Sequence, residues 1–215
     1  MKIIGFLGSA RVNGRCGKLL RRALEGAASK GAEVKRYDLI KCNIMYCRGC
    51  GKCFEHNPQL TIGKCPLKDD MRSILEEYVQ SDVYIFATPT HELFVTALMK
   101  TFLERKIALT SEEDPAEMPM ARPDVRANFM KMASFIVTAN APEELESVMG
   151  NPCYEAIEAG LMFEEVVTQE KLFVGGMRTI TDEAFSQKIN NAYQLGINLV
   201  DAIEKARGTA VNLPT

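Results

Sequence analysis

Val83-Tyr84-Ile85-Phe86-Ala87 is an unbroken apolar run, and Thr88-Pro89-Thr90-His91-Glu92 follows it directly. A run without polar alternation is typical of a central strand in a parallel sheet, because helices cover both faces of such a strand. Two segments with apolar residues at helical spacing flank it, one beginning at Asp69 and ending near Val79, the other at 94–109. The sequence therefore predicts a buried strand between two helices.

The same alternation continues in both directions from this run. We expect strands at 2–7, 33–39, 131–138 and 166–174, and helices at 15–30, 143–160 and 182–207. Strands that alternate with helices predict an α/β fold, here a doubly wound five-stranded parallel sheet with helices on both faces. A cysteine-rich loop (42–68) follows the second strand, and 110–128 is an irregular excursion. We expect residues 1–215 to form a single domain.

Two predicted loops lie where such a sheet binds ligands. Ligands of doubly wound sheets lie outside the carboxyl ends of the strands, at the point where the strand order reverses. The first turn, 8–17, reads GSARVNGRCG, and its hydroxyl, amide and guanidinium groups stand where the N–H groups of a helix begin. The second loop is 88–93. We expect the two loops to meet over one ligand that carries a phosphate.

Composition limits the possible partners and compartment. The 215 residues have a formal net charge of −2 and 47% hydrophobic content, which does not favour nucleic-acid binding. No apolar run is long enough to span a membrane. Seven cysteines in a chain whose start does not resemble a secretory signal predict a reducing compartment, the cytoplasm.

Four of these cysteines form the most specific motif of the chain. Cys47-Arg48-Gly49-Cys50-Gly51-Lys52-Cys53 has the C-x2-C-x2-C spacing that bacterial ferredoxins use for three ligands of an iron–sulfur cluster, and Cys65-Pro66 fits the fourth place. Free or redox-active thiols are the second interpretation. A structural zinc site is the third, although zinc more often uses two separated C-x2-C pairs.

The chain resembles the flavodoxin-like FMN-dependent reductases, and among them the iron–sulfur flavoproteins. The resemblance covers residues 1–107 well, and the remainder only by the order of its elements. It is carried by Gly8-Ser9-Ala10-Arg11-Val12-Asn13-Gly14, the four cysteines, Asp69-Asp70-Met71, Thr88-Pro89-Thr90 and Phe102-Leu103-Glu104-Arg105.

The resemblance implies two cofactors. An FMN phosphate would be held by Ser9, Arg11, Asn13, Gly14, Arg15 and Cys16, and the flavin ring would lie along Pro89, Thr90, His91, Glu92, Leu93 and Phe94. An iron–sulfur cluster, expected to be 4Fe-4S, would be held by Cys47, Cys50, Cys53 and Cys65. The chain departs from the family pattern at Cys16, where a small hydroxyl residue is usual, and at 138–142, where a glycine-rich turn is common.

We therefore expect an FMN-dependent electron-transfer oxidoreductase. Electrons would pass from a reduced nicotinamide or ferredoxin to FMN, then to the cluster, and finally to a small-molecule or protein acceptor. The resemblance also implies a homodimer or homotetramer, with 118–132 as a candidate contact. One alternative is an NAD(P)H-dependent FMN or quinone reductase without a cluster. A second is a non-catalytic electron carrier or zinc-stabilised domain that has lost FMN.

Overall fold

Five parallel strands form the central sheet of the protein. The computed structural model describes residues 1–57, 59–112, 119–122 and 131–210. The strands are β1 (Lys2–Leu7), β2 (Glu33–Asp38), β3 (Val83–His91), β7 (Met132–Thr138) and β8 (Val167–Val174). They lie in the order β2-β1-β3-β7-β8, and each neighbouring pair is parallel. This is the flavodoxin-like strand order, with its reversal between β1 and β3. The predicted fold class is confirmed.

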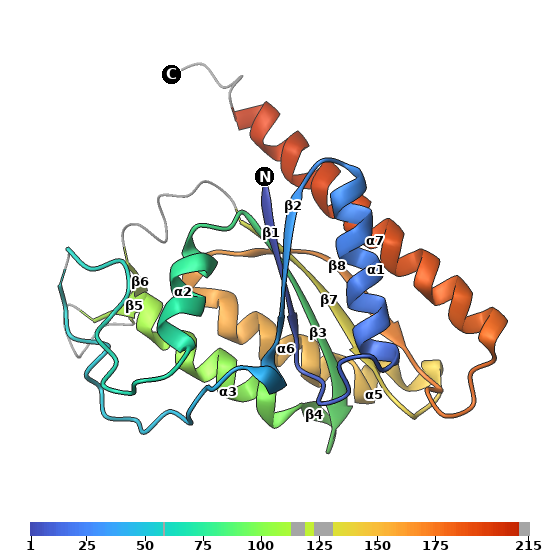
Figure 1. Cartoon of the computed structure of the whole chain (residues 1–215), viewed down its shortest axis with the longest axis horizontal. Coiled ribbons are helices and arrows are strands. Elements are labelled where there is room, and N and C mark those ends of the chain that lie inside the picture. The colour runs from blue at the N-terminus through green and yellow to red at the C-terminus, as the bar shows by residue number, and fades with distance from the viewer. Residues whose placement is uncertain (58, 113–118, 123–130, 211–215) are drawn as a thin grey trace.

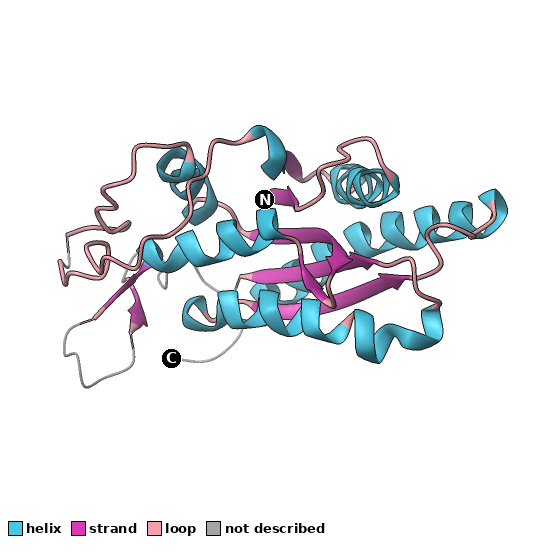
Figure 2. Cartoon of the chain, turned by 90° about the horizontal axis from the view of Figure 1, so that it is seen from below, coloured by secondary structure: helices cyan, strands magenta, loops and turns pink. Residues whose placement is uncertain are grey.

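Helices cover both faces of this sheet (Figures 1 and 2). One face carries α1 (Arg15–Ser29) and α7 (Asp182–Ala210), and the other carries α2 (Met71–Val79), α3 (Ala97–Arg105) and α6 (Asn151–Leu161). A hydrophobic core lies on each face of the sheet, and successive residues of a strand point into one core and then the other. In β3, Tyr84 and Phe86 face α2, α3 and α6, whereas Ile85 faces α1 and α7. This alternation follows from the two-residue period of a strand.

The helices α1 and α7 lie side by side and approach each other closely at two glycines (Figure 1). A Cβ atom at Gly196 would lie 1.9 Å from the carbonyl oxygen of Ala23, and one at Gly26 would lie 2.0 Å from that of Tyr193. Only glycine permits this contact between the two backbones.

Changing Gly196 to alanine is therefore expected to lower the free energy of unfolding by about 3 kcal/mol, because the helices must move apart to admit the methyl group. Gly208→Ala on the same helix is the matched control: no heavy atom lies within 4 Å of its added Cβ, and helix propensity predicts a gain of up to about 1 kcal/mol. Urea unfolding of the two variants measures both values. Equal effects would contradict the proposed helix contact.

The segment after β3 differs from the prediction. The expected helix at 94–109 begins only at Ala97, because β3 extends to His91 and turns back into β4 (Phe94–Val95), where His91 pairs with Phe94. Glu92 and Leu93 form the tight turn with φ of 49° and 61°. The helix α3 then begins after Thr96, whose hydroxyl accepts a hydrogen bond from the Met99 N–H.

The expected helix at 143–160 is divided into three parts. A 3₁₀ helix η3 (Glu143–Leu145) and a short α5 (Glu146–Met149) precede α6. Pro152 stands in the first turn of α6. It has no N–H to continue a helix that started upstream, so a new helix begins there.

Residues 110–128, predicted to be irregular, contain a short antiparallel ribbon. It consists of β5 (Thr110–Ser111) and β6 (Met120–Ala121), and it follows the 3₁₀ helix η2 (Lys106–Leu109). Most of the candidate subunit contact at 118–132 lies outside the described residues. In the described part of the chain, no helix is long and apolar enough to cross a membrane.

Candidate functional site

A cavity of about 420 Å³ lies at the carboxyl ends of the central strands. This volume falls within the range of small-molecule and cofactor sites. Eight of the twelve residues predicted to contact FMN line it: Ser9, Arg11, Gly14, Arg15, Cys16, Pro89, Thr90 and His91. The first and second predicted loops therefore meet at one cavity. Asn13, Glu92, Leu93 and Phe94 are not among its lining residues.

The first loop of this cavity is held in a fixed shape by its own backbone and by β2. The Ser9 hydroxyl accepts a hydrogen bond from the Arg11 N–H at 3.1 Å. Arg36 of β2 donates to the carbonyl oxygens of Val12 at 2.9 Å and Gly17 at 3.0 Å. A Cβ atom at Gly17 would lie 2.0 Å from the Val12 carbonyl oxygen, so glycine is required for the loop to close. The loop thus presents the N-terminus of α1 to the cavity.

The charges at this cavity favour an anion. Arg11, Arg15 and Arg178 line it, and the first N–H groups of α1 add the positive end of the helix dipole. Burial raises the pKa of the Cys16 thiol to about 12, against smaller opposing effects of Thr138 and Arg36. Cys16 is therefore neutral at physiological pH and adds no negative charge beside a bound phosphate.

Hydrogen bonds with the start of α3 and with α5 hold the loops of the cavity in place. The Thr96 hydroxyl donates to the Gly8 carbonyl oxygen at 2.6 Å, which ties the start of α3 to the end of β1. The Thr90 hydroxyl donates to the Met149 carbonyl oxygen at 2.8 Å. These contacts fix Pro89–His91 as one wall of the cavity.

A third wall of the cavity is not among the predicted contacts, although 138–142 was expected to stand where the family has a glycine-rich turn. Thr138, Ala139, Asn140, Met177 and Arg178 also line the cavity. Gly176 and Met177 donate backbone hydrogen bonds to Ala141 and Ala139, at 2.6 and 3.0 Å, and this joins the segments that follow β7 and β8. Their position at the carboxyl ends of parallel strands was the signal that could have identified them.

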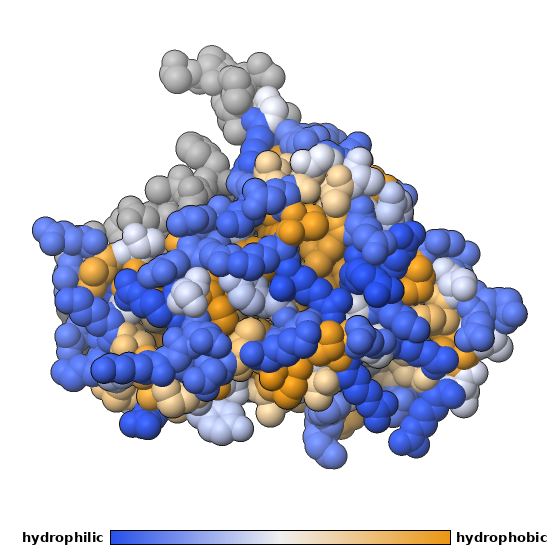
Figure 3. All heavy atoms as spheres, in the orientation of Figure 1, coloured by the Kyte–Doolittle hydropathy of each residue, from blue (hydrophilic) through white to orange (hydrophobic). Residues whose placement is uncertain are grey.

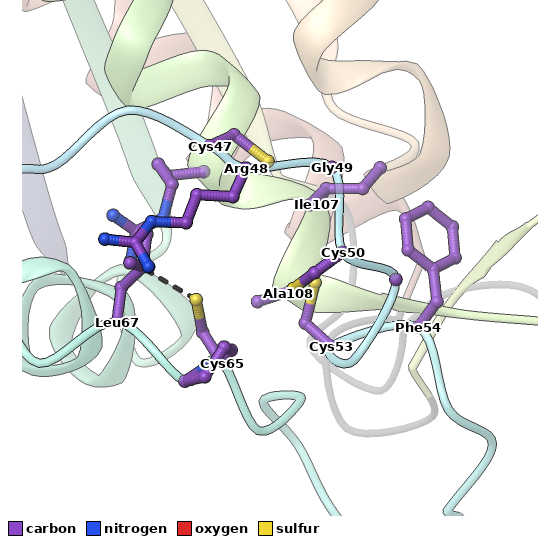
Figure 4. Close-up of a pocket in the computed structure, with 13 residues that line it drawn as sticks. Cys47, Arg48, Gly49, Cys50, Cys53, Phe54, Cys65, Leu67, Ile107 and Ala108 are labelled. Carbon is purple, nitrogen blue, oxygen red and sulfur yellow. Dashed lines mark hydrogen bonds between the residues drawn. The ribbon is translucent and has the colours of Figure 1, made fainter.

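The four predicted ligand cysteines line a second cavity, of about 140 Å³ (Figure 4). The loop bends around it at Gly49 and Gly51, whose φ angles are 62° and 71°. Cys47 and Cys50 are exposed, whereas Cys53 is buried. All seven cysteines lie in the described part of the chain and are free thiols. Within that part, no three His, Cys, Asp or Glu side chains are grouped closely enough to hold a metal ion.

A buried ion pair stands beside this second cavity. Arg105, at the end of α3, donates to Asp69 at 2.5 Å and to the Cys65 sulfur at 3.5 Å. The two charged side chains are 3% and 1% exposed. Burial alone would raise the pKa of Asp69, but hydrogen bonds from Arg105 and from two backbone N–H groups outweigh it and lower the pKa. A positive N–H group therefore faces Cys65, as an anionic sulfur would require.

A groove lies beside the cysteine cavity. It is lined by the cysteine loop, α3, η2, α6 and Phe94, and it shares Cys47, Gly49, Phe54 and Ile107 with the cysteine cavity. Phe94 pairs with His91, which lines the other cavity. Among the described residues, the two cavities themselves share no lining residue.

Known proteins resemble this chain in sequence over both sites. An iron-sulfur flavoprotein of Archaeoglobus fulgidus is 28% identical over 206 residues, which are 95% of this chain and 81% of that protein. An iron-sulfur flavoprotein of Methanocaldococcus jannaschii is 34% identical over 105 residues, 49% of this chain and 51% of its own length. The second match thus spans about half of either protein.

Solved structures resemble the fold. An NAD(P)H:quinone oxidoreductase from Methanothermobacter marburgensis has a TM-score of 0.71 at 17% identity, covering 93% of this chain and 98% of that one. An FMN-dependent NADH-azoreductase from Bacillus anthracis, in complex with FMN, has a TM-score of 0.65 at 10% identity, covering 92% and 97%.

The family described as NADPH-dependent FMN reductase matches residues 1–121, more than half of the chain. This match includes β1 to β3, the first loop and all four cysteines of the second cavity. The chain therefore belongs to the family of NADPH-dependent FMN reductases and is an FMN-dependent oxidoreductase.

Proposed function

We propose that this oxidoreductase is of the iron–sulfur flavoprotein type and passes electrons from a reduced donor through FMN to a cluster held by four cysteines. The observation that carries the proposal is the separation of two cavities. One lies at the strand ends and is lined by Arg11, Arg15 and Arg178, and the other is lined by Cys47, Cys50, Cys53 and Cys65.

The first cavity would hold FMN by its phosphate and by its ring. Ser9, Arg11 and the N–H groups that open α1 offer donors to the phosphate, and Arg15 adds a positive charge. Pro89–His91 and 138–140 would form the walls along the ring. Asn13 and residues 92–94 remain predicted contacts that lie beyond this cavity.

The second cavity offers the donor set of an iron–sulfur cluster, expected to be 4Fe-4S. Four thiols face it from one loop, and Arg105 supplies a hydrogen bond to the Cys65 sulfur. Bound FMN supplies conversion between paired and single electrons, and a bound cluster supplies single-electron transfer. The residues of the chain contribute position, hydrogen bonds and charge.

We propose a homodimer or homotetramer, because the two cavities of one chain do not touch. Large apolar side chains are exposed in η1, in the cysteine loop and in the turn after β3, among them Ile40, Tyr46, Leu93 and Phe94. In the orientation of Figure 1, the surface is mostly hydrophilic, with an apolar area at the lower centre, near the carboxyl ends of the strands (Figure 3). Such a group of apolar side chains suits contact with a second copy.

We also propose reduced nicotinamide as the first donor, ferredoxin as the other candidate, and a small molecule or a protein as acceptor. The family's description names NADPH. We further propose that residues 1–215 form one domain and that the protein acts in the cytoplasm without nucleic acid or membrane.

A second candidate function is an NAD(P)H-dependent FMN or quinone reductase without a cluster. It is favoured by two observations: the fold resembles that of a quinone oxidoreductase, and the described cysteines are not grouped as metal ligands.

Anaerobic stopped-flow mixing with NADPH distinguishes the first two candidates. For the iron–sulfur type, we expect loss of flavin absorbance, followed by a slower phase and an electron paramagnetic resonance signal from a reduced cluster. Flavin reduction without that signal would favour the reductase without a cluster. Flavin that NADPH and NADH leave oxidised, but that reduced ferredoxin reduces, would contradict the nicotinamide donor.

A further inference from the structure

Arg122 is a fully buried arginine whose hydrogen bonds all go to backbone carbonyl oxygens. It directly follows β6, and its side chain is among the largest that are less than 2% exposed. Its guanidinium donates to five carbonyl oxygens at 2.8–3.3 Å, those of Cys53, Glu55, Asn57, Leu60 and Ala108. One of these belongs to Cys53, the third predicted ligand, and three belong to the segment between it and the fourth. Arg122 thus holds that segment to the core.

The charge of Arg122 has no counter-ion in the described part of the chain. No carboxylate there lies within 4.0 Å of its guanidinium, whereas Arg105, which lines the cysteine cavity, is paired with Asp69. Arginine stays protonated in proteins, and a buried charge that only dipoles compensate costs free energy. The five N–H donors of a guanidinium suit the five carbonyl oxygens, so a structural role explains the hydrogen bonds, but it leaves the positive charge without a partner among the described residues.

The position of this charge points to the cysteine cavity. Cys53 and Ala108, whose carbonyl oxygens Arg122 binds, are themselves lining residues of that cavity. Gly63 makes room for the contact, because a Cβ atom there would lie 2.1 Å from the Cys53 carbonyl oxygen and 2.8 Å from the Arg122 guanidinium. The guanidinium therefore stands directly behind the cavity wall.

We propose that Arg122 is the charge partner of the group bound by the four cysteines and raises the reduction potential of that group. This inference rests on the proposed iron–sulfur function. Four thiolates make the site anionic, and reduction adds one further negative charge. A fixed positive charge behind Cys53 stabilises the reduced state more than the oxidised state. Arg122 is thus a positioning residue that acts through the cysteine loop.

Two substitutions separate charge from hydrogen bonding. Arg122→Gln keeps N–H donors and removes the charge, whereas Arg122→Lys keeps the charge with fewer fixed donors. Arg21→Gln is the matched control, because Arg21 is an exposed residue of α1 that pairs with Glu25. Each protein is purified anaerobically as the full chain, its iron is counted, and its reduction potential is measured by dye-mediated titration.

We expect Arg122→Gln to have a more negative reduction potential. At a fixed applied potential, the ratio of reduced to oxidised cluster should fall by more than about tenfold, which corresponds to about 59 mV for one electron. Arg122→Lys and Arg21→Gln should stay near the wild-type value. A Gln variant with full iron content and an unchanged potential would overturn the inference. A Lys variant that loses its iron, or shifts as far as the Gln variant, would overturn it too. Wild-type protein that contains no iron would instead contradict the proposed iron–sulfur function on which this inference rests.

Discussion

Changing Cys50 to serine is expected to remove the iron and the acid-labile sulfide from the protein and to leave its flavin content unchanged. Cys50 lines the cysteine cavity together with Cys47, Cys53 and Cys65. A serine hydroxyl remains protonated at neutral pH and is a poor replacement for a thiolate ligand. We expect iron per chain to fall by more than about tenfold, because the loss of one of four thiolate ligands weakens the hold of the loop on the cluster.

The flavin should survive because, among the described residues, its cavity shares no lining residue with the cysteine cavity. Cys42→Ser is the matched control. Cys42 begins the same loop, but its sulfur lies 3.5 Å from the Asp38 carbonyl oxygen and outside the cysteine cavity. Iron analysis and flavin absorbance measure the iron and flavin content per chain of both variants. An iron content of Cys50→Ser at the wild-type level would refute the prediction that Cys50 is a ligand.

Ser9→Asp is expected to have the opposite effect, expelling FMN and sparing iron. Ser9 is 6% exposed and lines the cavity at the strand ends, so a carboxylate there would stand beside the FMN phosphate. Two unit charges about 4 Å apart near a protein surface interact by about 4 kcal/mol. We therefore expect the dissociation constant of FMN to rise by more than about a hundredfold.

Ser9→Asn is the control for this substitution, because it has the size of aspartate without the charge. Its hydrogen bond with the Arg11 N–H can be retained, so only a modest loss of FMN is expected. Flavin fluorescence during titration of the apoprotein measures both constants. Equal FMN affinity of the aspartate and asparagine variants would contradict the binding of the FMN phosphate beside Ser9.

Most of the fold could be predicted because apolar strand segments alternate with helical segments along the chain. The apolar run at 83–87 lies in the middle strand of the sheet, 2–7 pairs with it, and 33–38 pairs with the other side of 2–7. A parallel sheet buries both faces of its central strands, so their sequence carries a strong and local signal. The meeting of the first loop with Pro89–His91 followed from the same topology.

The turn after β3 could not be predicted, because its residues do not carry the usual signal. Two-residue hairpins with positive φ favour asparagine, aspartate and glycine, whereas this chain has Glu92 and Leu93. The hairpin forms because Thr96 caps α3 and binds the end of β1. This tertiary contact moves the start of the helix and leaves Phe94 in the groove beside the cysteine loop.

The two buried arginines were also beyond local sequence reasoning. Arg105 reaches Asp69, 36 residues earlier in the chain, and Arg122 reaches Cys53, 69 residues earlier. No periodicity encodes such contacts, since they depend on how α3 and β6 pack against the loop. A pattern predicted the sulfur ligands, but only the folded chain reveals the charges around these cysteines.

The central claim is that one chain binds a flavin and an iron–sulfur cluster in two separate cavities. Anaerobic purification of the full chain, followed by an absorbance spectrum and by analysis of iron, sulfide, zinc and flavin, tests it most directly. We predict FMN together with iron and acid-labile sulfide in the same protein. Flavin without iron, or zinc without flavin, would contradict the claim.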